Sequence, residues 1–276
     1  MGAQLVSTSR LFAAAGVVHG FSLRGGGTSK APFASLNLSR AVGDEAAAVE
    51  ANLELLAASA GLAGGQAFHT ATQVHGDRVL AVREAGLVEI FPESEPVGAA
   101  LGAADPGEAK ADALVALDAG TCAAIRVADC VPVLLHDPDS GAVAAVHSGW
   151  RGAKRSIAGR SVRALAHVAG ANPGAVIAAI GPCIGRCCYA VSAELASTFR
   201  DLFGPLVADD PAKVAEPHLD LRACVEHALL AAGVPSGNLE QVEGCTSCDR
   251  DRFFSHRRDA GRTGRHLAFA VAGRGV

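Results

Sequence analysis

The chain of 276 residues is 50% hydrophobic and carries 24 basic against 28 acidic residues, while aromatic residues make up only 4%. This length can bury one large core, and we expect a single domain over residues 1–276. A nucleic-acid binder would need a basic excess for the phosphate backbone or aromatic side chains for stacking on bases. Neither nucleic acid nor an acidic membrane surface is therefore an expected partner.

The sequence predicts a cytoplasmic location. The apolar run near the start has no basic region before it and no small-residue cleavage site after it, unlike a signal peptide. No apolar stretch reaches the ~18 residues that a membrane span requires. In a reducing compartment the eight cysteines are expected to be free thiols or metal ligands, not disulfides.

The first predicted elements are a strand over residues 17–23 and a helix over residues 45–60. Arg24 and the glycines at 25–27 follow the strand directly. Consecutive glycines let backbone N–H groups approach an anion, and Arg24 would add positive charge, although a flexible surface turn explains the same residues. The helix has apolar residues at helical spacing, and Asp44 is expected to cap its start.

Residues 68–82 are predicted to be extended and contain the run Thr-Gln-Val-His-Gly. Strand alternation would place Gln73 and His75 on one side and Val74 on the other. His75 is either a metal ligand or an ordinary hydrogen-bonded histidine, and its position alone does not decide between them. Residues 93–110, rich in Ala, Gly and Pro, are expected to form an irregular excursion.

The most informative stretch is a predicted hairpin formed by residues 131–137 and 141–149, two apolar runs that flank a strong turn signal. If the turn centres near Asp139, Cys130 lies opposite the residue that follows His147. Facing side chains on such a pair are ~4.5–5.5 Å apart at Cβ. A thiolate at ~2.3 Å and an imidazole nitrogen at ~2.0–2.1 Å could then share one zinc ion.

Charged residues flank this hairpin on both sides. Asp129 is the carboxylate nearest to Cys130 in sequence, but alternation turns it away, so we expect it to accept hydrogen bonds elsewhere. A helix is predicted from just after Gly152 to about residue 169. Free N–H groups at its start favour an anion, which Arg151 could clamp; an ordinary surface ion pair is the alternative for Arg151.

The remaining elements follow from hydrophobic periodicity. We expect strands over 113–117, 122–128 and 175–180, helices over 193–203 and 219–232, and a closing strand pair over 239–243 and 265–271.

Two groups of cysteines lie in the C-terminal half. For Cys183, Cys187 and Cys188, small buried thiols beside tight glycine turns are favoured over a second metal site. The pair Cys245 and Cys248 is a weak zinc-ribbon signal, because structural zinc usually has four such ligands and the nearest histidine lacks a matching partner.

Three candidate ligands emerge: His75, Cys130 and His147. Imidazole and thiolate together suit Zn²⁺ or copper better than Mg²⁺ or Ca²⁺, which prefer oxygen. Three protein ligands leave a fourth position on zinc for water or substrate, as catalysis requires, and zinc can lower the pKa of a water molecule to about 7. The hairpin relates Cys130 to His147, whereas the inclusion of His75 does not follow from spacing.

Several motifs, in one order along nearly the whole chain, resemble the laccase-domain family, whose members are also called purine nucleoside phosphorylases and, in older naming, multicopper polyphenol oxidases. They are SLRGGGTS at 22–29, SLNLSRAVGDE at 35–45, TQVHG at 72–76, ADCVPVLL at 128–135, AAVHSGWRG at 144–152, GPCIGRCCYAV at 181–191 and SHRRDAGRTGR at 255–265.

The resemblance implies a zinc enzyme in which His75, Cys130 and His147 are metal ligands and catalytic residues. It implies phosphorolysis of adenosine, inosine, guanosine and methylthioadenosine to the free base and ribose 1-phosphate, and deamination of adenosine. The implied partners are purine nucleosides and inorganic phosphate. Our own candidates for contacting the phosphate are Arg24 and Arg151, and we expect a monomer or homodimer. The implied fold is a layered α/β sandwich with mixed sheets between helical layers, similar to bacterial toxin deamidases.

Three other functions use the same residues. A copper-dependent polyphenol oxidase follows from the older family name, but none of the ten histidines forms the His-x-His pairs common in multicopper laccases. A thiol hydrolase would use Cys130 as the nucleophile and His147 as its base. In a non-enzymatic protein, zinc would merely staple the hairpin to the segment that bears His75.

Overall fold

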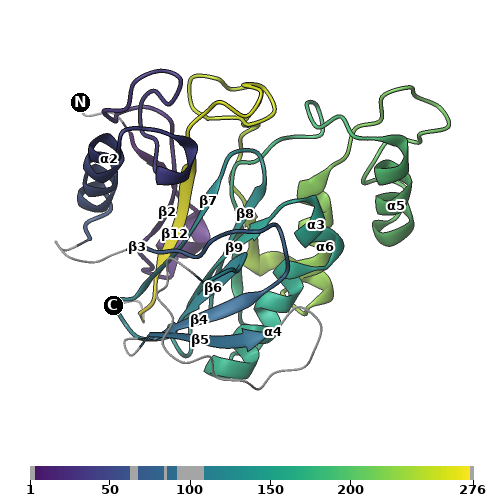
Figure 1. Cartoon of the computed structure of the whole chain (residues 1–276). Helices are drawn as coiled ribbons and strands as arrows, with labels where there is room; N and C mark the ends of the chain where they lie inside the picture. The colour runs from purple at the N-terminus through teal and green to yellow at the C-terminus, as the bar shows by residue number, and fades with distance from the viewer. Residues whose placement is uncertain (1–3, 63–67, 84–85, 92–108, 274–276) are drawn as a thin grey trace.

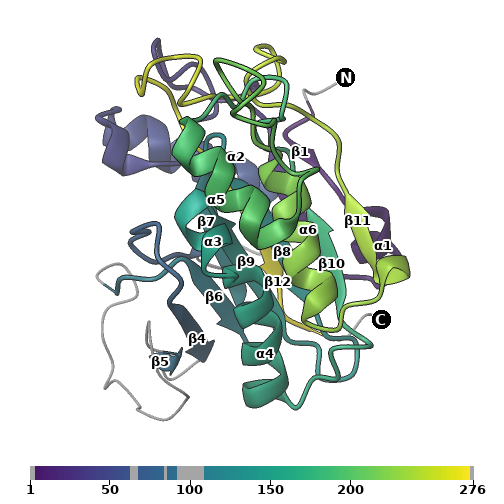
Figure 2. The same cartoon turned by 90° about the vertical axis from the view of Figure 1, so that its right-hand side faces the viewer.

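The computed structural model describes residues 4–62, 68–83, 86–91 and 109–273. Two mixed β-sheets lie face to face, with helices on the outer faces of both (Figure 1). The turned view shows α4, α5 and α6 in front of the larger sheet (Figure 2). This arrangement confirms the predicted layered α/β fold with mixed sheets flanked by helices.

The smaller sheet has five strands in the order β1-β2-β12-β7-β3. Only the β3–β7 pair is parallel; the other pairs are antiparallel. The strands are β1 (Val6–Ser7), β2 (His19–Ser22), β3 (Phe68–His69), β7 (Cys122–Val127) and β12 (His266–Val271).

The larger sheet has seven strands in the order β11-β10-β8-β9-β6-β4-β5. The pairs β10–β11 and β4–β6 are parallel and the others antiparallel. The strands are β4 (Val79–Arg83), β5 (Gly86–Phe91), β6 (Ala113–Ala116), β8 (Val131–His136), β9 (Val143–Ser148), β10 (Ile177–Ile180) and β11 (Leu239–Gln241).

Six α-helices and two short 3-10 turns complete the described elements. The larger sheet is covered by α3, α4, α5 and α6, the smaller one by α2 (Figures 1 and 2). The helices are α1 (Arg10–Ala14), α2 (Ala46–Ser59), α3 (Trp150–Lys154), α4 (Ile157–Ala169), α5 (Ala193–Phe203) and α6 (Leu221–Ala231), and the 3-10 turns are η1 (Arg40–Val42) and η2 (Ser236–Asn238).

The hairpin β8–β9 lies at the centre of the larger sheet, and every residue of both strands is buried. In β8, Val133 packs with the helices on one face while Leu134 packs between the two sheets. In β9, Val146 and Ala145 divide in the same way. A strand buried on both faces requires a continuous apolar run, which explains why this segment was recognisable from sequence.

The sequence predicted most element positions, with corrections to one helix and to one helix cap. The helix expected up to residue 169 is two helices, because Ser156 adopts φ 56° between α3 and α4. Asp44 does not cap α2; its carboxylate accepts from Asn37 and the Glu45 N–H, and Glu45 is the N-cap. At the start of α6, in contrast, Asp220 is the N-cap, and its side chain accepts from the Ala223 N–H.

The two strands expected to close the fold as a pair do not pair with each other. Strand β11 is an edge of the larger sheet, whereas β12 lies in the middle of the smaller one. Hydrophobic periodicity identifies a strand but carries no information on its partner, which explains the error. The excursion expected over 93–110 falls largely outside the described residues. Among the helices of the described residues, none has the length and apolarity to cross a membrane.

Candidate metal centre and adjoining pocket

His75 lies in the connection between β3 and β4, in a turn and not in the extended strand expected from sequence. Its φ is 59°, a left-handed conformation that is uncommon for residues other than glycine. Strand alternation does not apply to a turn, so the prediction that it places Gln73 and His75 on one face is wrong. Gln73 instead exchanges hydrogen bonds with the backbone of Arg126 on β7.

The turn that holds His75 is fastened to one buried carboxylate. Asp112 is 0% exposed and stands one residue before β6. Its carboxylate accepts from the backbone N–H groups of Val74 (3.2 Å), His75 (2.9 Å) and Gly76 (2.7 Å). These three bonds satisfy the donors of the turn and compensate for its strained backbone, so Asp112 fixes where the His75 imidazole can lie.

Cys130 and His147 come from the two ends of the hairpin, as expected, but the register differs by one residue. His147 lies opposite Pro132, and Ser148 lies opposite Val131, so Cys130 comes next to Gly149. The reason is that six residues, 137–142, separate the strands, so the turn centres between residues 139 and 140 and not at Asp139. The hairpin nonetheless places the thiol beside the imidazole.

The donor atoms of His75, Cys130 and His147 all lie within 4.8 Å of one another. The two imidazole centroids are 4.9 Å apart, with the ring planes at 81°. His147 Nδ1 lies 2.7 Å from Asp112 Oδ1, so the carboxylate also orients this ring and leaves Nε2 to bind elsewhere. A metal-ligating histidine almost always has such a partner on its other nitrogen.

Gly149 leaves the space that these donors need. A Cβ atom at this position would lie 3.0 Å from Cys130 Sγ and 3.2 Å from His75 Cδ2. The backbone of Gly149 is extended, at φ −76° and ψ 177°, so a side chain is excluded by space and not by conformation. The donor set and this space fit a soft divalent metal ion.

The electrostatics of the three donors favour a thiolate. Burial opposes ionisation of Cys130, but the His147 and His75 imidazoles outweigh it and lower the pKa of the thiol to about 6. Burial likewise opposes the charge on His147, but Cys130 and Asp112 raise its pKa to about 9. Burial would raise the pKa of Asp112, yet hydrogen bonds from His147 and the turn lower it. The thiolate form is the one that binds a metal.

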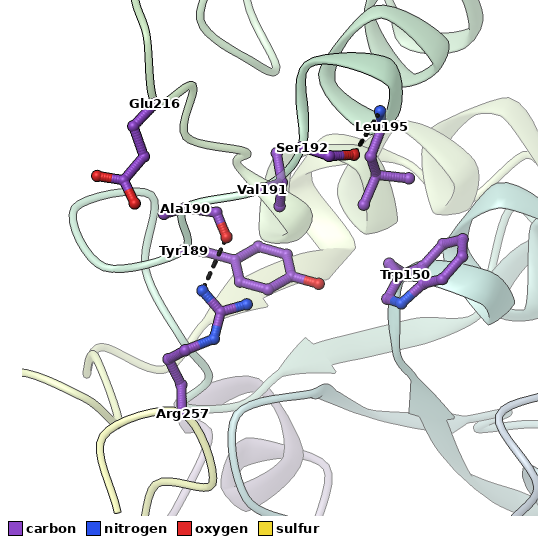
Figure 3. Close-up of a pocket in the computed structure, with 8 residues that line it drawn as sticks. All are labelled: Trp150, Tyr189, Ala190, Val191, Ser192, Leu195, Glu216 and Arg257. Atoms are coloured by element: carbon purple, nitrogen blue, oxygen red, sulfur yellow. Dashed lines mark hydrogen bonds between the residues drawn. The ribbon is translucent and has the colours of Figure 1, made fainter. Parts of the chain in front are cut away.

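An open pocket of about 400 Å³ lies close to the three donors, although none of them lines it. The Cys130 thiolate acts electrostatically on Tyr189, which is a lining residue. Trp150, three residues after His147, lines the pocket together with Tyr189 and Arg257. Figure 3 shows the Tyr189 ring between the Arg257 guanidinium and the Trp150 indole. Arg257 Cζ lies 5.0 Å from the centroid of the Tyr189 ring, a cation–π contact. Burial, together with the nearby Cys130 thiolate, raises the pKa of Tyr189 to about 12.

Asp129 connects the pocket to the thiol. Its φ is 94°, in the tight turn between β7 and β8. The carboxylate accepts from Thr246 Oγ1 at 2.6 Å and from the Arg257 N–H at 2.6 Å. Asp129 is thus a hydrogen-bond acceptor, as expected. It directly precedes Cys130 in the sequence and holds the backbone of Arg257, a residue that lines the pocket.

A family model described as multi-copper polyphenol oxidoreductase laccase matches residues 18–273. The chain belongs to this laccase family. One relative, "Purine nucleoside phosphorylase YlmD" of Geobacillus stearothermophilus, is 38% identical over 262 residues, which is 92% of this chain and 90% of the relative. A "Purine nucleoside phosphorylase" of Deinococcus radiodurans is 37% identical over 91% of this chain and 88% of its own.

Two further comparisons add to this. "Adenosine deaminase RL5", from an unknown prokaryotic organism, is 37% identical over 158 residues, covering 55% of this chain and 60% of that protein. The crystal structure of YlmD from Geobacillus stearothermophilus superposes with a TM-score of 0.80 at 33% identity, over 98% of this chain and 99% of that one. The fold of this laccase-family chain is therefore that of its solved relatives.

The two arginines expected to bind phosphate lie in different settings. Arg24 donates from Nε to the Ala34 carbonyl (2.8 Å) and from a terminal nitrogen to the Arg250 carbonyl (3.0 Å), so its guanidinium is engaged with backbone. Arg151 is exposed, and its Cζ lies 4.3 Å from the centroid of the Trp150 ring at the pocket. Arg151 does not itself line the pocket, but its guanidinium stacks on Trp150, which does. A phosphate contact stays a prediction for both arginines.

Sequence reasoning missed three residues of the site: Asp112, Tyr189 and Arg257. Asp112 could have been found from the sequence, because it directly precedes the apolar strand β6, and a carboxylate buried there needs hydrogen-bond partners. Tyr189 and Arg257 stand within the family-like motifs at 181–191 and 255–265, but nothing in their spacing relates them to Cys130.

Proposed function

We propose that this chain is a zinc-dependent purine nucleoside phosphorylase that also deaminates adenosine. The observation that carries the proposal is a two-imidazole, one-thiolate donor set close to an open pocket that is lined by two aromatic side chains and the Arg257 guanidinium. The names of the relatives, purine nucleoside phosphorylase for two and adenosine deaminase for one, agree with it.

His75, Cys130 and His147 would hold the zinc ion. Bound there, zinc would supply Lewis-acid chemistry, acidifying a water molecule or polarising a substrate oxygen. Asp112 would set the orientation of both imidazoles and keep Nε2 of His147 available, because its own carboxylate engages Nδ1.

The pocket suits a nucleoside and an anion. Trp150 and Tyr189 offer flat faces on which a purine can stack, worth about 1–3 kcal/mol per base. The Tyr189 hydroxyl stays protonated at neutral pH, since its pKa is about 12, and can donate a hydrogen bond. Arg257 and Arg151 would position inorganic phosphate so that one of its oxygens attacks C1′ as the bond to the base breaks.

Product analysis tests this proposal. Metal-quantified protein is incubated with adenosine or inosine, with and without phosphate, and the products are separated by chromatography. We expect ribose 1-phosphate and free base only when phosphate is present, and inosine from adenosine regardless of phosphate. His75→Ala, which removes one ligand, should abolish both reactions in a folded protein. Retention of either reaction in that variant would contradict the role of the metal site.

The phosphate contact is tested separately. Arg151→Ala should raise the KM for phosphate about tenfold or more, as loss of a hydrogen bond to a charged group predicts, while leaving the zinc content unchanged. Arg155→Ala is the matched control, because Arg155 lies on the same segment but pairs with Asp77. An equal effect of both substitutions would show that Arg151 contributes only general charge.

A thiol hydrolase is the second candidate, favoured by one observation. Without metal, the pKa values of about 6 for Cys130 and about 9 for His147 make a thiolate–imidazolium pair at neutral pH, as in cysteine nucleophiles. The two functions respond oppositely to zinc. Zinc binding would inhibit a hydrolase by occupying Cys130, whereas the phosphorylase would be activated by it.

Copper oxidase chemistry, suggested by the family description, has less support. A multicopper centre needs several groups of histidines, yet the described residues contain only two metal-competent groups, and the second consists of four cysteines. A blue-copper site has two histidines, a cysteine and a weak axial ligand, usually methionine. The chain has a single methionine, Met1. Reconstitution with Cu²⁺, read by visible absorption and oxidation of a phenol, checks this alternative.

A further inference from the structure

Four cysteines outside the site described above gather at one point. Cys187 and Cys188 follow β10, and Cys245 and Cys248 follow β11, so the two pairs come from loops about sixty residues apart in sequence. Their sulfur atoms all lie within 4.8 Å of one another. The sequence favours small buried thiols at Cys187 and Cys188 and gives only a weak zinc signal at Cys245 and Cys248. Cys187 and Cys248 are exposed, so burial does not explain them.

The sulfur spacing matches one ion bound by four thiolates. Cys187 Sγ lies 3.4 Å from Cys248 Sγ and 3.7 Å from Cys245 Sγ, and Cys188 Sγ lies 3.3 Å from Cys248 Sγ. A tetrahedron with zinc–sulfur bonds of ~2.3 Å has edges of about 3.8 Å. A disulfide would require about 2.05 Å. An iron–sulfur cluster would hold its cysteine sulfurs farther apart, because several irons separate them.

Backbone contacts hold the two loops together at this point. Cys183 and Cys245 form a parallel β-bridge, which extends the pairing of β10 with β11. The Thr246 N–H donates to the Cys183 carbonyl at 3.0 Å. The Gly185 N–H donates to Cys245 Sγ at 3.2 Å. The scaffold is therefore fixed by main-chain bonds that do not involve Cys187, Cys188 or Cys248.

The environment of Cys245 is that of a metal-binding thiolate. The N–H groups of Gly185, Cys248 and Ser247 point at its sulfur, and the Gly185 N–H lies 3.2 Å from it. Such N–H···S bonds orient a ligand and stabilise its charge. Gly185 also leaves room for the sulfurs, since a Cβ there would lie 3.2 Å from Cys187 Sγ and 3.4 Å from Cys245 Sγ.

We propose that Cys187, Cys188, Cys245 and Cys248 bind a second, structural zinc ion. Four protein ligands leave no position for substrate, which is the arrangement of structural and not catalytic zinc. The tetrathiolate set also excludes Mg²⁺ and Ca²⁺, which prefer oxygen.

The location of this site gives it a consequence for the pocket. Cys188 precedes Tyr189, which lines the pocket, and Cys245 precedes Thr246, which donates to Asp129. The same Asp129 carboxylate accepts from the Arg257 N–H. A zinc ion that clamps the two loops would therefore brace two walls of the pocket without touching a ligand in it.

Metal stoichiometry tests the proposal independently of enzymatic activity. Protein purified with zinc present and then desalted is analysed by inductively coupled plasma and native mass spectrometry. We expect about two zinc ions per chain in the wild type, about one in Cys248→Ser, about one in His75→Ala, and none in the double variant. Cys224→Ser is the matched control, since Cys224 is buried in the core away from both sites, and it should keep both ions.

The His75→Ala protein separates this inference from the proposed function. If it keeps one zinc ion that is lost with Cys248→Ser, the structural site stands whatever the protein catalyses. If Cys248→Ser does not fold, Co²⁺ is loaded into His75→Ala instead, and tetrathiolate coordination should give intense thiolate-to-cobalt absorption. Chelation should lower the Tm of His75→Ala by several degrees.

Three results would overturn the proposal. One is a wild-type protein with a single zinc ion that disappears in His75→Ala. The second is iron in place of zinc at the four cysteines. The third is a disulfide among these cysteines in protein isolated under non-oxidising conditions, detected by peptide mapping without reduction.

Discussion

Asp112 is the residue on which the candidate metal centre most depends, and Asp112→Asn removes its charge while keeping its shape. Oδ1 accepts from the His75 N–H and from His147 Nδ1, and Oδ2 accepts from the N–H groups of Val74 and Gly76. An asparagine has one oxygen, so its NH₂ group must face two former donors. With NH₂ toward the turn, two buried N–H groups lose their acceptor.

With NH₂ toward His147, the imidazole could accept that hydrogen bond only by moving its proton to Nε2, which is the nitrogen needed for the metal. Either orientation leaves at least one buried backbone N–H unpaired, at about 1–3 kcal/mol. Loss of a partner behind a metal ligand typically costs ~10–100-fold in affinity. We therefore expect Asp112→Asn to lower zinc affinity within that range and to reduce stability moderately.

The assay is a competition titration of the purified variant against a chromophoric chelator, with circular dichroism as a check on folding. Asp77→Asn is the matched control. Asp77 is also buried, at 4% exposed, and follows Gly76, but it pairs with Arg155 and Arg160 and not with either imidazole. Wild-type zinc affinity in Asp112→Asn, or an equal loss in Asp77→Asn, would refute the reasoning.

Three further predictions concern the thiol, the space around it and the pocket. In metal-free protein the alkylation rate of Cys130 should rise as pH increases through about 6, because the thiolate forms there, whereas an ordinary cysteine responds near ~8.5. Peptide mass spectrometry measures this rate. Zinc should protect the Cys130 thiol from alkylation. Gly149→Ala should bind zinc more weakly without unfolding, since its Cβ would crowd Cys130 Sγ at 3.0 Å, and full metal content would contradict this. Trp150→Leu should raise the nucleoside KM about tenfold or more while Trp150→Phe restores part of it, and equal KM values for both variants would exclude stacking.

The sequence predicted the hairpin because its physical determinants are local. Apolar residues on both sides of a polar turn specify β8 and β9, and the ends of the hairpin then bring Cys130 and His147 together. The register was wrong by one residue because the length of the turn depends on hydrogen bonds around Asp137 that composition does not encode. The same reasoning located α2, α5 and α6 through their apolar periodicity.

The position of His75 depends on non-local interactions and could not be predicted in this way. Its turn is stabilised by Asp112, nearly forty residues later, and no periodic pattern connects the two. Only the resemblance to the laccase-domain family placed His75 with the other ligands. The gathering of the four cysteines could not be predicted for the same reason, since the parallel pairing of β10 with β11 joins loops that are far apart in sequence.

The two arginines expected to contact phosphate differ in how well the sequence predicted their surroundings. Arg151 was expected at the start of a helix beside His147, and it lies there because the connection from β9 is short. Arg24 was chosen for the glycines that follow it, but its guanidinium donates to the Ala34 and Arg250 carbonyls. A glycine-rich loop indicates backbone freedom, and that freedom serves loop packing as readily as anion binding.

The most direct test of the metal centre is anomalous X-ray scattering at the zinc absorption edge, from crystals of protein that was purified without added metal. A strong anomalous peak bonded to His75, Cys130 and His147 is predicted, with an open coordination position facing the pocket. If these crystals show no such peak, zinc is added to the crystallisation solution; three side chains that still carry no anomalous peak would contradict the account.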